Sequence, residues 1–289
     1  MSDLKVTRKI RNEVDRLMLF ARHDHTLVKT LVKKDILKIL SSVCPQFKRN
    51  YEECFLKYVD GLKRTKMTSF GRIRYVHRIR DLETLREMFS LKDYSLMKSF
   101  IPKNGDVVLD AGAGIGEYSL VAANLVGRHG KVIGIEPNEE SYLYLKKNAK
   151  LNRTKNIISI NAAISNKMGK IKIFSIPGTS VVDSINHEMA GTKRFYLTNA
   201  VTIDYIVKRF HLKGLDIIKL DVEGAELLVL LGAKNSLKMF RPKIMIEIHS
   251  KKLSYLTRKF LEKLNYMIEL EKIKCSSPYI SLIYASYTR

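Results

Sequence analysis

The fold is decided by residues 107–116, which read Val107-Val-Leu-Asp-Ala-Gly-Ala-Gly-Ile-Gly116. The apolar run at residues 107–109 predicts a short buried strand. Glycines follow at every second position, and the next residues, Tyr-Ser-Leu-Val-Ala-Ala-Asn-Leu, have helical spacing. A strand, a glycine turn and a helix are typical of the start of a nucleotide-binding α/β unit. The spacing alone is a weak signal, because glycines also make ordinary strand-to-helix turns.

Two acidic residues end two successive predicted strands. Asp110 ends the first strand, and Glu136 ends the second, which covers residues 131–136. Dinucleotide-binding folds need a free helix N-terminus for a pyrophosphate, whereas an acid at this point suits a cationic ligand without phosphate. S-adenosylmethionine, which has a sulfonium and an amino group, fits this requirement. Glu136 also lies close to the spacing at which an acid binds a ribose diol. The sequence therefore predicts S-adenosylmethionine as the cofactor.

From residue 107 onward, predicted strands and helices alternate, which indicates a parallel sheet. The strands are expected at 107–110, 131–136, 157–161, 170–176, 215–221 and 243–248, and the helices at 117–127, 139–151, 202–210, 225–232 and 252–264. Residues 177–200 are expected to be irregular. The last two strands, 266–273 and 279–286, have no helix between them and should pair antiparallel at the sheet edge. This pattern predicts an α/β fold of the class I methyltransferase type: a Rossmann-like seven-stranded sheet with one antiparallel strand.

A basic, mainly helical part, residues 1–80, is expected to precede a methyltransferase domain at 81–289. Amphipathic helices are predicted at 4–20, 26–40 and 45–59. Apolar and arginine residues alternate in 72–80, which predicts a strand or ribbon with an arginine face; a solvated edge is the slightly favoured interpretation. Asp81 and Asp93 are placed to cap two short helices that end at about residues 89 and 100.

The net charge of the 289-residue chain is +23. Such an excess favours polyanionic partners such as nucleic acid, but dispersed basic side chains also simply coat helices, and both interpretations stay open. No apolar run reaches the ~18 residues of a membrane span. The charged N-terminus has no apolar signal region, and the three cysteines (Cys44, Cys54 and Cys275) lack metal-binding spacing. These features predict a protein of the reducing cytoplasm.

Residues from about Glu83 to His249 resemble the FkbM family of S-adenosylmethionine-dependent methyltransferases. The resemblance is carried by G-D-V-V-L-D-A-G-A-G-I-G-E-Y-S-L, I-E-P-N, N-A-A-I-S, V-T-I-D, I-I-K-L-D-V-E-G-A-E and P-K-I-M-I-E-I-H. The I-I-K-L-D-V-E-G-A-E and E-I-H runs are more specific than the first two segments. The chain departs from the usual family pattern at Gly114 and Glu117.

The resemblance implies O-methylation, mostly of hydroxyls on sugars or secondary metabolites, so the expected partner is a small-molecule or glycan acceptor. The residues that it places at the cofactor are Asp110, Ala111, Gly112, Gly114, Gly116, Glu136, Pro137, Asn138, Ala162, Ala163 and Asp221. The residues that it places at the reaction centre are Asp221, Glu223, Glu247 and His249. Glu136 would bind the ribose, and Ala162 and Ala163 would lie near the adenine.

The ordinary pKa of histidine, about 6.5, suits His249 as a general base. Glu223 is equally well explained as a stabiliser of a helix N-terminus. A divalent ion held by Asp221, Glu247 and His249 has suitable ligand types but is not favoured, so no metal is predicted.

Two alternative functions stay open. The basic charge is compatible with an RNA methyltransferase that acts on the ribose 2′-hydroxyl. Base methylation is disfavoured, because the chain after the fourth core strand has neither an N/D-P-P-Y/F loop nor a cysteine nucleophile. The second alternative is a non-catalytic basic binding module, against which the paired acids and the acid–histidine cluster argue.

Overall fold

The structure is a computed structural model that describes residues 66–78, 81, 84–85, 88–89, 93–175, 184–185, 194–274 and 280–288. The chain divides into two compact units, and every described residue belongs to the unit formed by Leu62–Lys274 and Tyr279–Arg289. The helices expected at 4–20, 26–40 and 45–59 lie outside the described residues, as do the three cysteines. The division into residues 1–80 and 81–289 stays a prediction.

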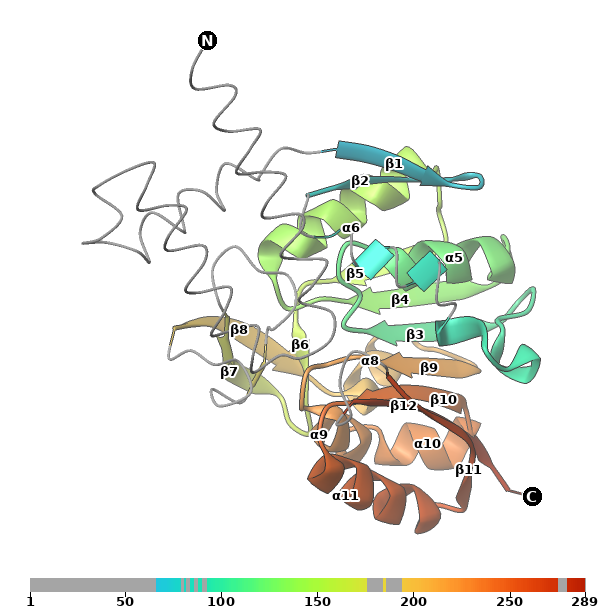
Figure 1. The fold of residues 1–289 in the computed structure, drawn as a ribbon, viewed down its shortest axis with the longest axis vertical. Helices are drawn as coiled ribbons and strands as arrows, with labels where there is room; N and C mark the ends of the chain where they lie inside the picture. The colour runs from blue at the N-terminus through green and yellow to red at the C-terminus, as the bar shows by residue number, and fades with distance from the viewer. Residues whose placement is uncertain are drawn as a thin grey trace, which may run out of the picture. The chain divides into compact units, whose positions relative to one another are not determined.

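A seven-stranded sheet in the order β11-β12-β10-β9-β3-β4-β5 forms the centre of this unit (Figure 1). Its strands are β3 (Val107–Ala111), β4 (Lys131–Ile135), β5 (Ile157–Ile160), β9 (Ile217–Leu220), β10 (Lys243–Ile248), β11 (Tyr266–Ile273) and β12 (Ser281–Tyr287). The pairs from β5 to β10 are parallel, whereas β12 runs antiparallel to both β10 and β11. The predicted sheet with one reversed strand and a final antiparallel pair is confirmed.

Helices cover both faces of this sheet, because successive residues of a strand point to opposite faces. They are α5 (Glu117–Val126), α6 (Glu139–Leu151), α8 (Ile203–Arg209), α9 (Glu226–Leu231), α10 (Lys234–Phe240) and α11 (Lys251–Glu262). Val108 joins the core cluster of Tyr118 on α5, whereas its neighbour Leu109 joins the cluster of Val229 and Leu261 on α9 and α11. In such sheets, ligands bind outside the carboxyl ends of the strands.

A second, three-stranded sheet differs from the sequence expectation. It has the order β6-β8-β7 and consists of β6 (Ala163–Ile164), β7 (Gly169–Phe174) and β8 (Phe195–Val201). The strand expected at 170–176 therefore lies outside the central sheet, and residues 195–200, which were expected to be irregular, form a strand together with Val201. Phe195 and Leu197 are 49% and 61% exposed. Because these apolar side chains lie at exposed positions, the alternating burial of β8 does not appear in the sequence as the alternation of apolar and polar residues that predicts a strand.

One helix was not predicted, and one helix prediction needs correction. The helix expected at 225–232 is present as α9 and is followed, after Gly232 and Ala233, by the unpredicted α10. A Cβ added at Gly232 would lie 2.2 Å from the carbonyl oxygen of Ser165, so this break lets two backbones approach closely. The helix expected from Asp93 to residue 100 is replaced by two short 3₁₀ helices, η4 (Asp93–Ser95) and η5 (Lys98–Phe100).

A hairpin of β1 (Lys66–Phe70) and β2 (Ile73–His77) covers α6, as the ribbon expected near residues 72–80 predicts. Asn148 of α6 and Asn152, which directly follows α6, bind the free edge of β2. Asn148 accepts the N–H of Val76 at 2.7 Å and donates to its carbonyl at 3.0 Å. Asn152 likewise accepts the N–H of Arg74 at 2.9 Å and donates to its carbonyl oxygen at 2.6 Å. The spacing fits, because four helical residues and two strand residues both span about 6–7 Å.

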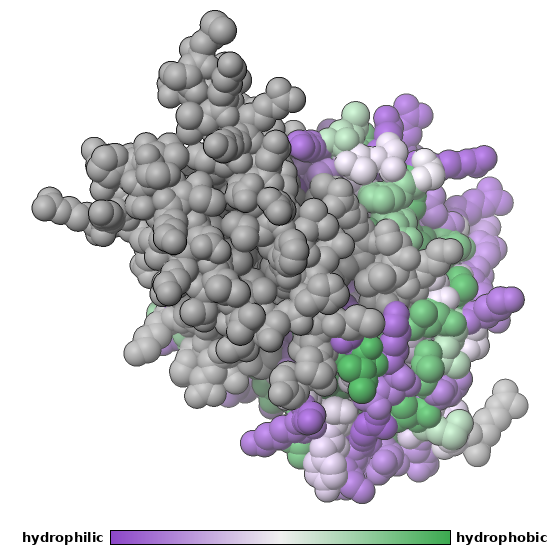
Figure 2. Space-filling model, viewed as in Figure 1, coloured by the Kyte–Doolittle hydropathy of each residue, from purple (hydrophilic) through white to green (hydrophobic). Residues whose placement is uncertain are grey.

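The described part of the face in Figure 2 shows hydrophobic residues in small, separate patches among hydrophilic ones. Scattered exposed apolar side chains of this kind are normal for a folded protein. Among the helices of the described residues, none has the length and hydrophobicity needed to cross a membrane.

Candidate active site

The glycine turn after β3 brings two parts of the predicted site into contact. Gly112 has a φ of +75°, which side chains rarely adopt, and its N–H donates to the carbonyl oxygen of Ile135 at 3.0 Å. A Cβ added at Gly112 would lie 1.8 Å from the carbonyl oxygen of Asp221. The turn after β3 and the chain after β9 therefore touch through their backbones, and any side chain at Gly112 would force them apart.

Glu136, at the end of β4, is held in place by backbone hydrogen bonds. Its two carboxylate oxygens accept the N–H groups of Gly114 at 2.8 Å and Asn138 at 2.9 Å. The residue is 7% exposed and lines a cavity. Asn161 donates to the carbonyl oxygens of Glu136 and Pro137 and thereby fixes the backbone at the same point. Glu136 thus presents a fixed acidic group at the carboxyl end of the sheet.

Asp110 lies behind the cavity wall and not in it. Its side chain is fully buried, and Ser119 donates to it at 2.6 Å. The ammonium group of Lys219 lies 3.2 Å from the other carboxylate oxygen and donates to the carbonyl of Gly112 at 2.8 Å. Burial lowers the pKa of Lys219, but the charges of Asp110 and Asp221 outweigh this and hold it well above its usual range. The contact to the glycine turn is therefore made by Lys219, which Asp110 anchors.

A cavity of about 210 Å³ lies against the carboxyl ends of the strands. Of the residues placed in the site from the sequence, those that line it are Gly112, Gly114, Glu136, Pro137, Asn138, Ala162, Ala163, Asp221, Glu223 and Glu247. The other four, Asp110, Ala111, Gly116 and His249, do not line it. Gly116 instead caps α5, where an added Cβ would lie 2.7 Å from Leu145. The cavity thus unites most of the predicted cofactor residues with three of the four predicted catalytic residues.

Asp221 and Glu247 come from neighbouring parallel strands, β9 and β10, and share a partner in Tyr94. The Tyr94 hydroxyl lies 3.2 Å from Asp221 and 3.4 Å from Glu247. Each carboxylate also faces one lysine: Asp221 lies 3.6 Å from Lys219, and Glu247 lies 2.7 Å from Lys274. Sequence reasoning missed Tyr94, Lys219 and Lys274 as residues of the site, although Lys219 lies within the most specific motif.

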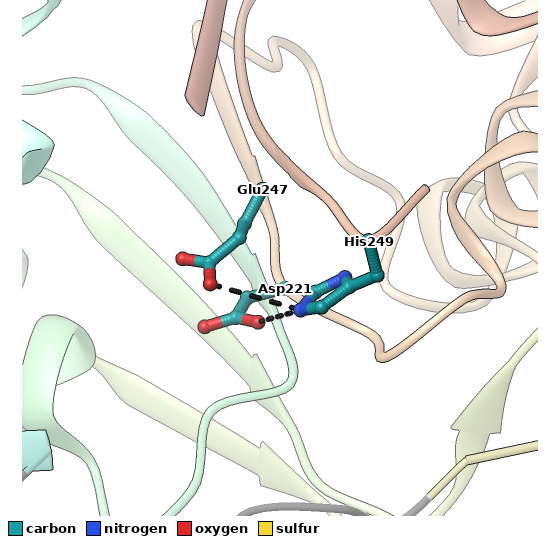
Figure 3. Close-up of side chains that lie close together, drawn as sticks. All are labelled: Asp221, Glu247 and His249. Carbon is teal, nitrogen blue, oxygen red and sulfur yellow. Dashed lines mark ion pairs between the residues drawn. The ribbon is translucent and has the colours of Figure 1, made fainter. Parts of the chain in front are cut away.

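His249 points its Nε2 at the carboxylates, as Figure 3 shows for Asp221 and Glu247. Its Nδ1 is hydrogen-bonded to the buried carboxylate of Glu226 at 2.6 Å. Burial lowers the pKa of His249, but the bond to Glu226 and the charges of Glu223, Glu226 and Asp221 raise it to about 10. The expectation of an ordinary histidine pKa near neutrality is therefore wrong, and the imidazole in this arrangement is a cation at neutral pH.

Glu223 stands two residues after Asp221, in a backbone conformation with a φ of +47°. Its carboxylate lies 3.3 Å from Nε2 of His249, and its carbonyl oxygen accepts the hydroxyl of Ser184 at 2.6 Å. Burial raises the pKa of Glu223, the His249 charge lowers it, and nearby carboxylates raise it again, to about 8. The helix that follows begins at Glu226, three residues later.

Arg78 departs from the favoured interpretation of residues 72–80 as a solvated edge, whereas Arg72 and Arg74 are exposed as that interpretation expects. It is 1% exposed, pairs with Asp81 at 2.8 Å and with Glu140 at 2.9 Å, and donates to Ser141 at 2.9 Å. Arg78, Asp81 and Ser141 all line the cavity. The three-residue spacing of Arg78 and Asp81 was the signal available in the sequence, because it brings the two side chains together in a tight turn.

Glu117, one of the two departures from the family pattern, also lines the cavity. It is 8% exposed, and its carboxylate accepts the N–H of Ile115 at 3.0 Å. Burial raises the pKa of Glu117 to about 8. The side chain also occupies the space beside Gly114, where an added Cβ would lie 2.6 Å from it. The two departures are therefore in direct contact.

Comparison with known families decides the family of this chain. Residues 110–272 match the family model described as the Methyltransferase FkbM domain, which is more than half of the chain. The chain belongs to the FkbM methyltransferase family. The resemblance of this FkbM family member, inferred above from its sequence motifs, is thereby confirmed. No curated protein matches the chain.

Several solved structures resemble this FkbM methyltransferase. The methyltransferase FkbM from Methylobacillus flagellatus KT has 15% identity and a TM-score of 0.48, over 83% of this chain and 60% of that one. A SAM-dependent methyltransferase from Aquifex aeolicus has 16% identity and a TM-score of 0.42, over 81% and 98%. The M. jannaschii tRNA m1G37 methyltransferase has 14% identity and a TM-score of 0.43, over 78% and 57%. This chain therefore spans 60% of the length of the Methylobacillus protein.

Proposed function

We propose that this enzyme transfers a methyl group from S-adenosylmethionine to a hydroxyl group on a small molecule or glycan. The observation that carries the proposal is that Asp221, Glu223 and Glu247 line the same cavity as the glycine turn and Glu136. A hydroxyl acceptor must be oriented and must lose its proton, and carboxylates beside the cofactor can do both.

The cavity residues fit the chemical groups of S-adenosylmethionine. The carboxylate of Glu136, fixed by the N–H groups of Gly114 and Asn138, would hold the ribose diol. Ala162 contributes to an apolar wall that suits an adenine ring. Lys219 and Tyr94 hold one carboxylate oxygen of Asp221, whose pKa is lowered by Lys219 against the effect of burial. Asp221 is therefore an anion that would hold the amino group of the cofactor.

The bound cofactor supplies an electrophilic methyl group: the acceptor oxygen forms a bond to this carbon while the carbon–sulfur bond breaks toward sulfur. Glu223 is the residue that we place as the acceptor of the hydroxyl proton. Its carboxylate lines the cavity and is 27% exposed. Among the described residues its side-chain ion pair is with His249, whereas Asp221 and Glu247 each face a lysine. His249, which is cationic and outside the cavity lining, would position Glu223 and would not take the proton itself.

A second acceptor class is a ribose hydroxyl of RNA, which the net charge of +23 favours. The non-catalytic binding module is set aside, because the chain belongs to a family of methyltransferases. The two acceptor classes differ in one measurable property, the sensitivity of the labelled product to nuclease.

The test is transfer of tritiated methyl groups to fractionated cell extract, with and without nuclease. We expect the label in nuclease-resistant small molecules or glycans. Glu223→Gln should lower turnover by about 10²–10⁴ while cofactor affinity stays the same. Glu262→Gln, on the exposed end of α11, is the matched control. Nuclease-sensitive label would make RNA the acceptor, and near-normal turnover of Glu223→Gln would remove it as the base.

A further inference from the structure

Three side chains of different types point their ligand atoms at one another beside the cavity. Asp221, Glu247 and His249 each offer one such atom, and these atoms lie within 4.8 Å of one another (Figure 3). Asp221 directly follows β9, Glu247 belongs to β10, and His249 directly follows β10. The parallel pairing of these two neighbouring strands brings the side chains to the same edge of the sheet.

The two oxygens of each carboxylate have different surroundings. Oδ2 of Asp221 faces Tyr94 at 3.2 Å and Lys219 at 3.6 Å, and Oε2 of Glu247 faces Lys274 at 2.7 Å. Oδ1 of Asp221 and Oε1 of Glu247 instead face Nε2 of His249. The outer oxygens are thus held by donors, which fixes the direction of the inner ones. Metal-binding carboxylates are commonly supported by outer hydrogen bonds of this kind.

The distances at His249 suit a cation better than they suit direct hydrogen bonds. Nε2 lies 3.9 Å from Asp221, 3.7 Å from Glu247 and 3.3 Å from Glu223. With metal–ligand bonds of about 2.1 Å, adjacent ligands of an octahedral cation lie about 3.0 Å apart and opposite ligands about 4.2 Å apart. The distances to Asp221 and Glu247 lie between these two values, and both are too long for a good hydrogen bond.

The other nitrogen of the same ring supplies an independent indication. Nδ1 of His249 is only 2.6 Å from the carboxylate of Glu226, which is fully buried. Metal-binding histidines characteristically donate their second N–H to a carboxylate, which fixes the tautomer and orients the free nitrogen at the metal. The imidazole is 95% buried, since its side chain is 5% exposed, and Nε2 is aimed into the carboxylate group.

Charge leads to the same conclusion. Four carboxylates, those of Asp221, Glu223, Glu226 and Glu247, lie within 3.9 Å of the His249 ring nitrogens. Of the two lysines beside them, Lys219 is shared with Asp110. Without a metal, a proton on Nε2 of His249 supplies part of the positive charge that these carboxylates need. A divalent cation that takes the place of this proton would supply more charge without burying another side chain.

We propose that Asp221, Glu247 and His249 bind a divalent cation of the manganese class, while Glu223 stays outside the ligand set as the acceptor of the hydroxyl proton. One imidazole and two carboxylates match the ligand preferences of this class. Because Asp221 and Glu247 also line the cavity, the remaining coordination positions open toward the acceptor. This inference deepens the proposed function and rests on it: the cation would orient the acceptor hydroxyl and make its proton easier to remove.

The test is direct binding of Mn²⁺ to the full chain. Binding is measured by calorimetry and by the loss of the electron paramagnetic resonance signal of the free ion. We expect one tight site per chain in the wild type. Glu247→Gln and His249→Gln should each weaken Mn²⁺ binding by at least about tenfold, because changing even a residue that supports a metal ligand typically lowers metal affinity by this factor. Glu262→Gln should leave it unchanged. Thermal unfolding of each variant shows whether it is folded. If the His249→Gln protein does not fold, the Glu247→Gln protein still tests the metal site.

Absence of Mn²⁺ and Zn²⁺ binding to the wild type, or equal binding by all variants, would overturn the proposal. Binding of S-adenosylmethionine, measured in the same samples after chelation, separates this failure from failure of the proposed function. If the cofactor binds and methyl transfer continues in the presence of chelator, the enzyme assignment stands and the metal site is wrong.

Discussion

The ammonium group of Lys219 lies 3.2 Å from the carboxylate of Asp110, and both residues are at most 4% exposed. This pair joins β9 to β3 behind the cavity, and Lys219 carries the contact on to the carbonyl of Gly112. Removing one member leaves the other charge buried without its partner. We expect Lys219→Met to lower the free energy of unfolding by about 3–5 kcal/mol.

The double variant Asp110→Asn, Lys219→Met is the control for this prediction. It leaves neither charge behind, so it should be more stable than Lys219→Met alone in urea unfolding. If Asp110→Asn lowers the free energy of unfolding by the same amount in the Lys219→Met protein as in the wild type, the two residues are not energetically coupled.

Glu136→Ala should weaken binding of S-adenosylmethionine by about ten- to a hundredfold. The reason is the loss of a hydrogen bond to a charged group, which contributes roughly 1.5–3 kcal/mol. Calorimetry measures the affinity, and Glu139→Ala, an exposed acid in the next helix, is the matched control. Equal affinities in both variants would show that Glu136 does not contact the cofactor.

Gly112→Ala should destabilise the fold by roughly 2 kcal/mol or more, because strained backbone alone costs about 1–3 kcal/mol. The new Cβ would also lie 1.8 Å from the carbonyl oxygen of Asp221, which must move. Gly214→Ala is the comparison: its nearest neighbour would be 3.9 Å away, so stability should hardly change. Thermal unfolding of the two proteins side by side measures the difference, and similar melting temperatures would contradict the close approach.

Glu117 should make the folded state less stable as the pH rises. Its pKa is about 8 in the folded protein, above the ordinary value, so the folded state holds a proton that the unfolded state has already lost. Stability is therefore complete below the unfolded pKa of about 4.3 and is lost progressively as the pH approaches the folded pKa. Each unit of the shift corresponds to about 1.4 kcal/mol.

Glu117→Gln, which resembles the protonated acid, should exceed the stability of the wild type by far more at pH 9 than at pH 5. Urea unfolding at both pH values measures this. A difference between the two proteins that is the same at pH 5 and pH 9 would mean that Glu117 does not titrate in this window.

The central sheet was predictable because its strands are short apolar runs separated by amphipathic helices, and the order of these elements admits few topologies. Strand β8 was not predictable, since Phe195 and Leu197 are exposed and conceal its alternation. The site was predictable where a residue follows a strand directly, as Glu136 and Asp221 do. The burial of Arg78 and the high pKa of His249 depend on partners from other elements, Glu140 and Glu226, which no local pattern reveals.

The two asparagines at the end of α6 and directly after it have a further consequence for the behaviour of the protein in concentrated solution. Asn148 and Asn152 occupy the backbone groups of Val76 and Arg74 that a neighbouring strand would otherwise bind. A strand edge with unpaired groups is a template for pairing with another chain. The helix thus blocks self-association without adding a strand, and a chain with both asparagines replaced by leucine would offer β2 as an open edge for aggregation.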